Sequence, residues 1–135
     1  MPGYSGTPLW KKLGYKAGLT AFVHQPPADY VAMLDLPRDV PVTWAPKFKA
    51  GLPFAHLFVT GFAELRTRLT KYRGAIAPDG AVWVSWPKKT SGVPTDITED
   101  RIRAAALPLG FVDIKVCAVD DTWSGLKLVI RKELR

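Results

Sequence analysis

The sequence contains one cysteine, Cys117, and two histidines among 135 residues. A single cysteine excludes a disulfide framework and fits a reducing compartment. No apolar run approaches the roughly 20 residues of a membrane-spanning helix. The first six residues lack the charged beginning and apolar middle of a signal peptide. We therefore expect a cytoplasmic protein with no membrane segment.

Motifs with a defined chemistry are missing as well. The chain has no P-loop, no nucleophile elbow and no glycine fingerprint for a dinucleotide. His24 and His56 are far apart and no paired carboxylates accompany them, so no metal site is recognisable. Cys117 lies inside an alternating strand-like run, which gives a nucleophile little access. We expect no cofactor, no metal and no standard catalytic group.

The charge is basic but not concentrated. Nineteen Lys and Arg against twelve Asp and Glu give a net charge of +7, spread along the chain without a long basic block. A spread excess favours solubility and a weak attraction to polyanions, whereas dedicated nucleic-acid binders carry a motif or a concentrated patch. Weak nucleic-acid binding therefore remains a third hypothesis. It would use the exposed face of one helix, with Arg66, Arg68, Lys71 and Arg73.

Apolar runs predict six strands, over residues 18–24, 40–44, 54–60, 81–86, 111–119 and 126–132. Pro41 places the second strand at or near an edge of the sheet. Only residues 120–125 join the last two strands, which is too short for a parallel crossover, so these strands must form an antiparallel hairpin.

Three helices are predicted between these strands. Pro26 and Pro27 open a short one that Pro37 ends. The clearest has an apolar stripe at spacings of three and four, formed by Phe62, Leu65, Leu69, Tyr72 and Ile76. The third is capped by Asp96 or Thr98 and ends at Gly110, with a buried face formed by Ile102, Ala105, Ala106 and Leu109.

The alternation of strands and helices predicts an α/β fold over a single domain, residues 1–135. We expect a Rossmann-like, mostly parallel sheet with helices on both faces and a C-terminal antiparallel hairpin strand. Five tryptophans and an edge strand make a homodimer a further expectation, although no sequence feature decides it.

Residues 54–132 resemble the second half of class I methyltransferases. The resemblance is topological: a helix, the turn Ala77-Pro78-Asp79-Gly80, a strand, and a closing antiparallel hairpin. The family binds S-adenosylmethionine (SAM) on a glycine-rich loop after its first strand, where the backbone must approach the cofactor closely. The matching segment here, residues 24–29, has no glycine. No acidic residue ends the second strand, because Asp39 precedes it, and one strand–helix unit is missing.

Four sequence segments are similar to a family of short bacterial proteins described as a domain of unknown function. They span residues 3–9, 56–60, 84–89 and 121–127, so the similarity covers nearly the whole chain. This resemblance implies a bacterial source. It implies no assigned activity and carries over no catalytic residue.

The stretch richest in side chains that can bind a ligand follows the strand at residues 81–84. Its sequence is Ser85-Trp86-Pro87-Lys88-Lys89-Thr90-Ser91-Gly92. In open α/β sheets, ligands bind at the carboxyl ends of the strands. That edge should also receive His24, Thr60, Asp121 and Trp123. Lys88 and Lys89 would hold an anionic group, Trp86 or Trp123 would stack on a planar one, and the hydroxyls of Thr60, Ser85, Thr90 and Ser91 would supply hydrogen bonds.

Each of these residues has a structural alternative. Trp86 and Trp123 could simply close the open end of the sheet, with the lysines as solvated loop charges. Asp120 and Asp121 suit a turn as well as a general base or a cation contact. His24 could be a general base or a hydrogen-bonded structural histidine, and His56, in mid-strand, is expected to be structural.

The leading hypothesis is a non-catalytic binding or regulatory module that takes a small anionic ligand or a protein partner at this edge. A residual methyltransferase-like transferase is the alternative. The missing glycine loop favours the first hypothesis, because a fold alone does not license a function.

Overall fold

The computed structural model describes residues 6–135. Residues 1–5 lie outside the described residues. They include Gly3 to Ser5 of the first segment similar to the bacterial family, and most of the N-terminal six residues that lack signal-peptide features. The strands are β1 (Leu19–His24), β2 (Val42–Trp44), β3 (Phe54–Phe58), β4 (Ala81–Pro87), β5 (Phe111–Ala118) and β6 (Trp123–Ile130). The helices are α1 (Leu9–Leu13), α2 (Tyr30–Leu34), α3 (Phe62–Arg73) and α4 (Glu99–Ala106), with the short 3-10 turns η1 (Lys89–Ser91), η2 (Leu107–Leu109) and η3 (Lys132–Leu134).

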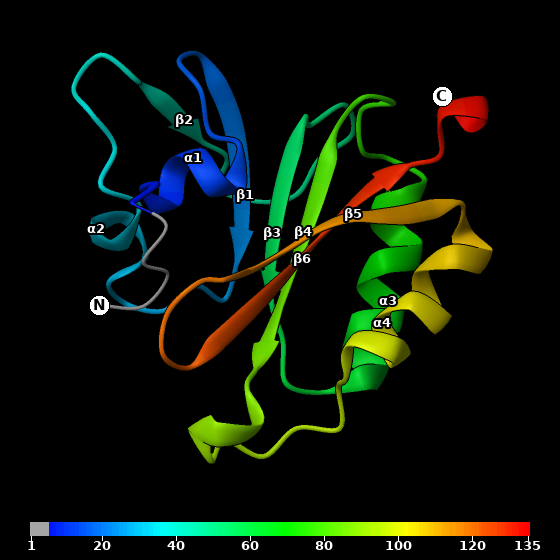
Figure 1. Ribbon diagram of the computed structural model, residues 1–135. Coiled ribbons are helices and arrows are strands. Elements are labelled where there is room, and N and C mark those ends of the chain that lie inside the picture. The colour runs from blue at the N-terminus through cyan, green and yellow to red at the C-terminus, as the bar shows by residue number, and fades with distance from the viewer. Residues whose placement is uncertain (1–5) are drawn as a thin grey trace.

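The strands form one sheet in the order β2-β1-β3-β4-β6-β5. Strands β1 to β4 pair in parallel, and β6 runs antiparallel to both β4 and β5. Figure 1 shows β1, β3 and β4 pointing the same way, so their carboxyl ends meet at the lower edge of the view. The predicted Rossmann-like, mostly parallel sheet with an antiparallel hairpin is confirmed.

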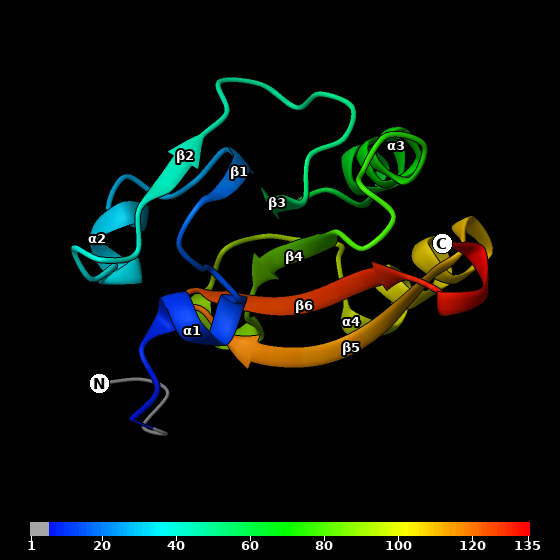
Figure 2. The same cartoon turned by 90° about the horizontal axis from the view of Figure 1, so that it is seen from above.

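Two apolar cores lie on the two faces of the sheet, with α1 and α2 over one face and α3 and α4 over the other (Figures 1 and 2). On the α3 side, Leu65, Leu69 and Tyr72 are fully buried, which confirms the predicted stripe. On the α1 side, Trp83 is fully buried and its indole N–H donates to the carbonyl of Leu13 at 2.8 Å. Burial of these large side chains fixes which face each helix covers.

Several predicted boundaries differ from the observed ones. The prediction missed α1, because five residues are too few for a helical period to stand out. Helix α2 begins at Tyr30, so Pro26 and Pro27 precede its first turn instead of opening it. Helix α3 ends at Arg73, before the buried Ile76. Strand β2 is short and lies at the edge, as Pro41 predicted.

A loop over residues 45–53 joins β2 to β3 and carries no helix. Phe48 from this loop stacks on Tyr72 of α3 with ring centroids 3.9 Å apart and an 8° angle between the planes. Aromatic packing therefore holds this loop against α3. Among the described residues, no helix is both long and apolar enough to cross a membrane.

Candidate functional site

The carboxyl edge of the sheet receives the segments that the sequence singled out. His24 ends β1, Thr60 follows β3, the Lys88–Gly92 turn follows β4, and the tip of the β5–β6 hairpin, residues 119–122, lies beside that turn. The backbone N–H of Lys88 donates to the carbonyl of Thr122 at 2.8 Å, which ties the turn to the hairpin. The structure thus brings these segments to one edge, although their side chains do different things there.

His24 is buried and faces α3. Its Nε2 lies 3.1 Å from Oε2 of Glu64, and the same oxygen accepts from Nε of Arg68 at 3.4 Å. Two neighbouring groups therefore already engage this carboxylate, and the imidazole serves to anchor the end of β1 to the first turn of α3. This geometry supports the structural alternative for His24.

The turn after β1 differs from a glycine loop that binds a cofactor. Gln25 has a φ of 51°, in the left-handed region that favours glycine. Pro26 and Pro27 follow it and have no backbone N–H to donate. A glycine loop offers a run of free N–H groups and a backbone without Cβ atoms, whereas this turn lacks two of those donors and has a Cβ at every position.

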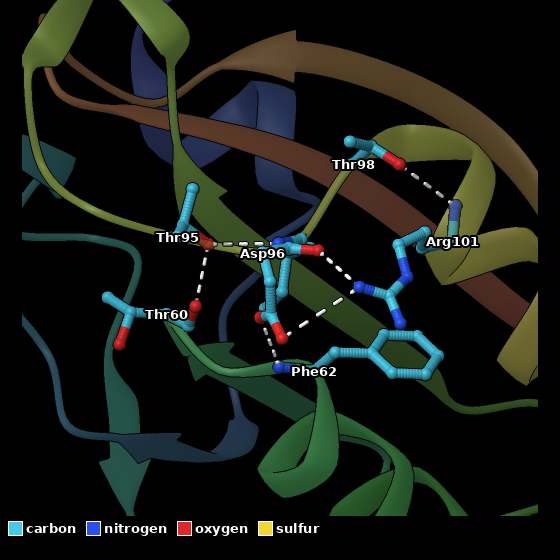
Figure 3. A network of polar contacts seen from close by, with 7 residues as sticks. Thr60, Phe62, Thr95, Asp96, Thr98 and Arg101 are labelled. Atoms are coloured by element: carbon cyan, nitrogen blue, oxygen red, sulfur yellow. Dashed lines mark hydrogen bonds and ion pairs between the residues drawn. The ribbon is translucent and has the colours of Figure 1, made fainter.

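A connection over residues 88–98 runs along the carboxyl edge from β4 to α4 (Figure 1). Figure 3 shows how it is fastened to the start of α3. Asp96 Oδ1 accepts the backbone N–H of Phe62 at 2.7 Å, and the hydroxyl of Thr95 donates to the carbonyl of Thr60 at 2.6 Å. Asp96 therefore caps α3, and the N-cap of α4 is Thr98, whose hydroxyl accepts from the N–H of Arg101.

Arg101 completes this network. Its Nη1 donates to the carbonyl of Asp96 at 2.9 Å, and its guanidinium lies 4.0 Å from the ring centroid of Phe62 (Figure 3). The carboxylate of Asp96 thus occupies the N-terminus of α3, where backbone N–H groups and the helix dipole favour negative charge. Thr60, a predicted hydrogen-bonding residue, is exposed and uses its carbonyl in this network.

The lysine turn, Lys88 to Ser91, is held by its own polar groups. Ser91 Oγ donates to the carbonyl of Lys88 at 2.7 Å and accepts the N–H of Val93 at 3.1 Å. Ser91 is therefore a turn-stabilising residue. Lys89 and Thr90 are exposed and Lys88 is half-buried. No ion pair engages either lysine within the described part of the chain.

Trp86 and Trp123 lie on opposite faces of the sheet. Trp86 is 8% exposed and packs in the core under α3 and α4, whereas Trp123 packs in the core under α1 and α2. The Trp123 ring meets Phe58 edge-on at 5.1 Å between centroids. Both tryptophans close the end of the sheet, so one planar ligand cannot stack on both of them.

The two acids at the hairpin tip, Asp120 and Asp121, have different surroundings. Asp120 Oδ1 accepts the backbone N–H groups of Thr122 and Trp123 at 2.8 and 2.7 Å, which is a turn-forming role. Asp121 is exposed. The sequence could not divide these roles, because adjacent acids in a turn look alike until the backbone direction is known.

A buried polar chain crosses the core on the α1 side. Tyr15 Oη lies 2.7 Å from Tyr30 Oη, Tyr30 Oη lies 2.8 Å from His56 Nδ1, and His56 Nε2 lies 2.7 Å from Ser85 Oγ. His56 is fully buried, and burial lowers its pKa to about 3, so the imidazole is neutral. Burial likewise raises the pKa of both tyrosines. A serine beside a histidine has no access to solvent here, and His56 is structural in this geometry.

Sequence reasoning missed a hollow of about 350 Å³ between the start of α1, the end of α2 and the hairpin tip. Its lining is mainly apolar, with Lys12, Asp35 and Asp120 among the polar residues. The lining comes from segments far apart in sequence, so no single motif could have revealed it.

Three further candidates are a metal site, the thiol of Cys117 and the basic face of α3. The described residues contain no group of three or more His, Cys, Asp or Glu side chains that could hold a metal ion. Cys117 is half-buried, and burial raises the pKa of its thiol, which disfavours the reactive thiolate. On α3, Arg66 and Lys71 are exposed, whereas Arg68 pairs with Glu64 and Arg73 is half-buried. The basic face proposed for nucleic acid is therefore smaller than the sequence suggested.

Comparisons with known proteins identify the fold. The scan against family models and the search of curated proteins found no match. Among solved structures, the chain is similar to magnesium protoporphyrin IX methyltransferase from Synechocystis PCC 6803 with bound SAM (TM-score 0.60, 11% identity, 90% of this chain and 74% of that one). It is also similar to a SAM-dependent methyltransferase from Aquifex aeolicus (TM-score 0.59, 14% identity, 89% and 86%).

A third similar structure is LepI in complex with SAM (TM-score 0.55, 12% identity). The match covers 93% of this chain but only 47% of LepI, so the chain spans about half of that protein's length. At these identities the similarity establishes the fold alone. The methyltransferase-like topology expected from the sequence is confirmed.

Proposed function

We propose that this chain is a non-catalytic binding module on a methyltransferase-like scaffold, and that it takes an anionic group on the lysine turn at Lys88 and Lys89. The observation that carries the proposal is the turn after β1. There, Gln25, Pro26 and Pro27 stand in place of a glycine loop.

The residues at this edge do not fit SAM held in the manner of the fold family. The prolines remove two backbone donors and the turn has no glycine for close backbone approach. The second strand ends at Trp44, followed by Ala45, Pro46 and Lys47, so no carboxylate is available there for ribose hydroxyls. Asp96 already caps the N-terminus of α3. We therefore derive no catalytic step through this cofactor.

The lysine turn offers a different chemistry. Lys88 and Lys89 have no carboxylate partner among the described residues, and the exposed hydroxyl of Thr90 lies between Lys89 and Ser91 in η1. Two ammonium groups and a hydroxyl suit a phosphate or carboxylate. The hydrogen bond from Lys88 to Thr122 holds the turn against the hairpin, so the lysines project from a fixed backbone. Ser91 and Asp120 contribute to the site by shaping this backbone.

The comparisons favour a second candidate, a transferase that uses SAM. Two of the similar structures are described as methyltransferases and two contain SAM. This candidate requires SAM to bind without the glycine loop and without an acid at the end of β2.

Thermal unfolding distinguishes the two candidates. The melting temperature is measured for the protein alone and with S-adenosylhomocysteine, inorganic phosphate or ATP. We expect phosphate or ATP to raise the melting temperature by several degrees at saturation, because a ligand that binds only the folded state stabilises it. S-adenosylhomocysteine should leave it unchanged.

The variant Lys88→Ala/Lys89→Ala should markedly reduce the shift without changing the melting temperature of the free protein. Lys47→Ala/Lys49→Ala is the matched control, because it removes two exposed lysines from another loop. A shift with S-adenosylhomocysteine that survives the lysine variant would replace the binding module with the transferase. An equal loss in both lysine variants would mean that net charge, and no local site, attracts the anion.

A further inference from the structure

Three lysines converge at the C-terminal end of α1, away from the turn at Lys88. Lys12 belongs to α1, Lys115 to β5 and Lys127 to β6, and we call them the α1 lysine cluster. Lys115 and Lys127 are direct partners in the β5–β6 register. The ammonium of Lys115 donates to the carbonyl of Lys12 at 2.9 Å, and the ammonium of Lys127 lies under Gly14, 3.6 Å from where a Cβ of that residue would be.

The carbonyls at the end of α1 are already engaged. Those of Trp10 and Lys11 accept the backbone N–H groups that close the helix, and that of Leu13 accepts the indole of Trp83. The carbonyl of Lys12 accepts Lys115. Within the described part of the chain, no hydrogen bond or ion pair reaches the ammonium of Lys127, which is half-buried. Its three N–H donors therefore have no acceptor among the described residues.

Neither Lys115 nor Lys127 forms an ion pair with an acid within the described residues. Residues 1–28 contain no Asp or Glu. The nearest acid on β5 is Asp113, but a register irregularity between Asp113 and Lys115 sends these two side chains to opposite faces of the sheet. Asp113 accepts from Nε of Arg103 on the α4 side at 3.0 Å, while Lys115 faces α1.

Two like charges opposite each other on paired strands destabilise a sheet. Burial together with the charge of Lys115 lowers the pKa of Lys127, so the protein itself does not compensate this charge. An anion placed between the two ammonium groups would supply the missing acceptors and remove the repulsion. A phosphate oxygen array suits several lysine donors at once.

We propose that the α1 lysine cluster binds the phosphate group of a small compound, with Lys127 and Lys115 as its direct contacts. This site is independent of the proposed function, since it uses other residues on the α1 face of the sheet. The recessed position of Lys127 beneath Gly14 favours a compact phosphate over a nucleic-acid backbone, which requires an extended exposed row of cations.

Isothermal titration calorimetry with inorganic pyrophosphate measures binding, and thermal unfolding with the same compound measures stabilisation. Sodium chloride at equal ionic strength is the reference for charge screening. We expect pyrophosphate to bind and to raise the melting temperature by several degrees. Lys127→Met and Lys115→Met should each weaken the affinity about tenfold or more, because each removes a charged hydrogen-bond donor while keeping an apolar stem. Lys71→Met, on the exposed surface of α3, is the matched control and should leave the affinity unchanged.

A second readout does not depend on affinity. In the free protein, Lys127→Met should keep or raise the melting temperature, since it removes the repulsion with Lys115. In wild-type protein, NMR titration of the Lys127 ammonium should show a pKa that rises when pyrophosphate is added. A Lys127 pKa indifferent to pyrophosphate would overturn the proposal.

The two anion sites are separable. Lys88→Ala/Lys89→Ala should retain the pyrophosphate response of Lys127, and Lys127→Met should retain any shift caused by the lysine turn. If a DNA duplex binds through Lys115 and Lys127 while pyrophosphate does not, the small-compound proposal is wrong and the cluster is a nucleic-acid contact. If only Lys88→Ala/Lys89→Ala removes pyrophosphate binding, the cluster proposal is wrong and the proposed function stands.

Discussion

The Nε2 atom of His56 lies 2.7 Å from Oγ of Ser85, on the neighbouring strand, in a fully buried position. Tyr30 occupies the other ring nitrogen and Tyr15 extends the chain. Every link is made of neutral groups, and their protons can point in either direction along the chain. Buried polar groups that satisfy one another in this way fix one arrangement of α2, β3 and β4, because any shift would leave donors or acceptors unpaired.

Acid should destabilise the protein through His56. Its pKa is about 3 in the folded state, against 6.5 ordinarily, so below pH 6.5 the unfolded chain takes up a proton that the folded protein does not. The free energy of unfolding should therefore fall as the pH decreases from about 6.5 toward 3, by on the order of 1 kcal/mol per pH unit. Urea unfolding between pH 7.5 and 5 measures this slope, before most carboxylates titrate.

The variant His56→Gln should flatten this dependence of stability on pH. The variant His24→Gln leaves His56 in place and should retain it. A wild-type stability that is constant over this range would show that His56 is not buried and neutral in solution.

Removing the hydroxyl of Tyr30 should destabilise the fold. Tyr30→Phe leaves both His56 Nδ1 and the hydroxyl of Tyr15 without a partner, which costs about 1–3 kcal/mol. Tyr72→Phe is the control, because the Tyr72 hydroxyl lies in the core on the other face of the sheet, outside this polar chain. Urea titration of the two variants should show a clear loss for the first and little change for the second. Equal losses would contradict the role of the chain.

The connection over the carboxyl edge should depend on Asp96. Asp96→Ala removes the acceptor for the N–H of Phe62 and should lower the free energy of unfolding by about 1 kcal/mol, as loss of a helix cap does. Asp96→Asn keeps an oxygen acceptor and should recover most of that loss. Asp79→Ala, in an exposed turn, removes the same charge and should be near neutral. If Asp79→Ala matches Asp96→Ala, net charge and not capping explains the effect.

A side chain at Gly110 should strain the fold. Its φ is 99°, and a Cβ there would lie 2.8 Å from Cδ1 of Leu134 and 3.1 Å from Nε of Arg73. Gly110→Ala should therefore lower the free energy of unfolding by about 1–2 kcal/mol. Gly74 has a φ of −77°, which alanine adopts readily, so Gly74→Ala should be neutral or slightly stabilising. Thermal unfolding of the pair provides the comparison, and similar melting temperatures would refute the strain at Gly110.

The sequence predicted the elements whose signals are local. The stripe of Leu65, Leu69 and Tyr72 marked α3, and the short connection predicted at residues 120–125 required an antiparallel hairpin, whose second strand begins earlier, at Trp123. It did not predict α1, because five residues show no period. It also assigned Asp96 to the wrong helix as a candidate cap, because its partner, Phe62, lies thirty-four positions earlier in the chain.

The sequence by itself determined the α/β class, the location of the carboxyl edge and the absence of a glycine loop, since each follows from residue types and short spacings. Only the tertiary structure decided what the side chains at that edge contact. His24 turned to Glu64, Asp96 capped α3, and Trp86 and Trp123 separated to opposite faces. The lysines from α1, β5 and β6 met for the same reason: contacts across a sheet depend on strand order and register, which no single segment encodes.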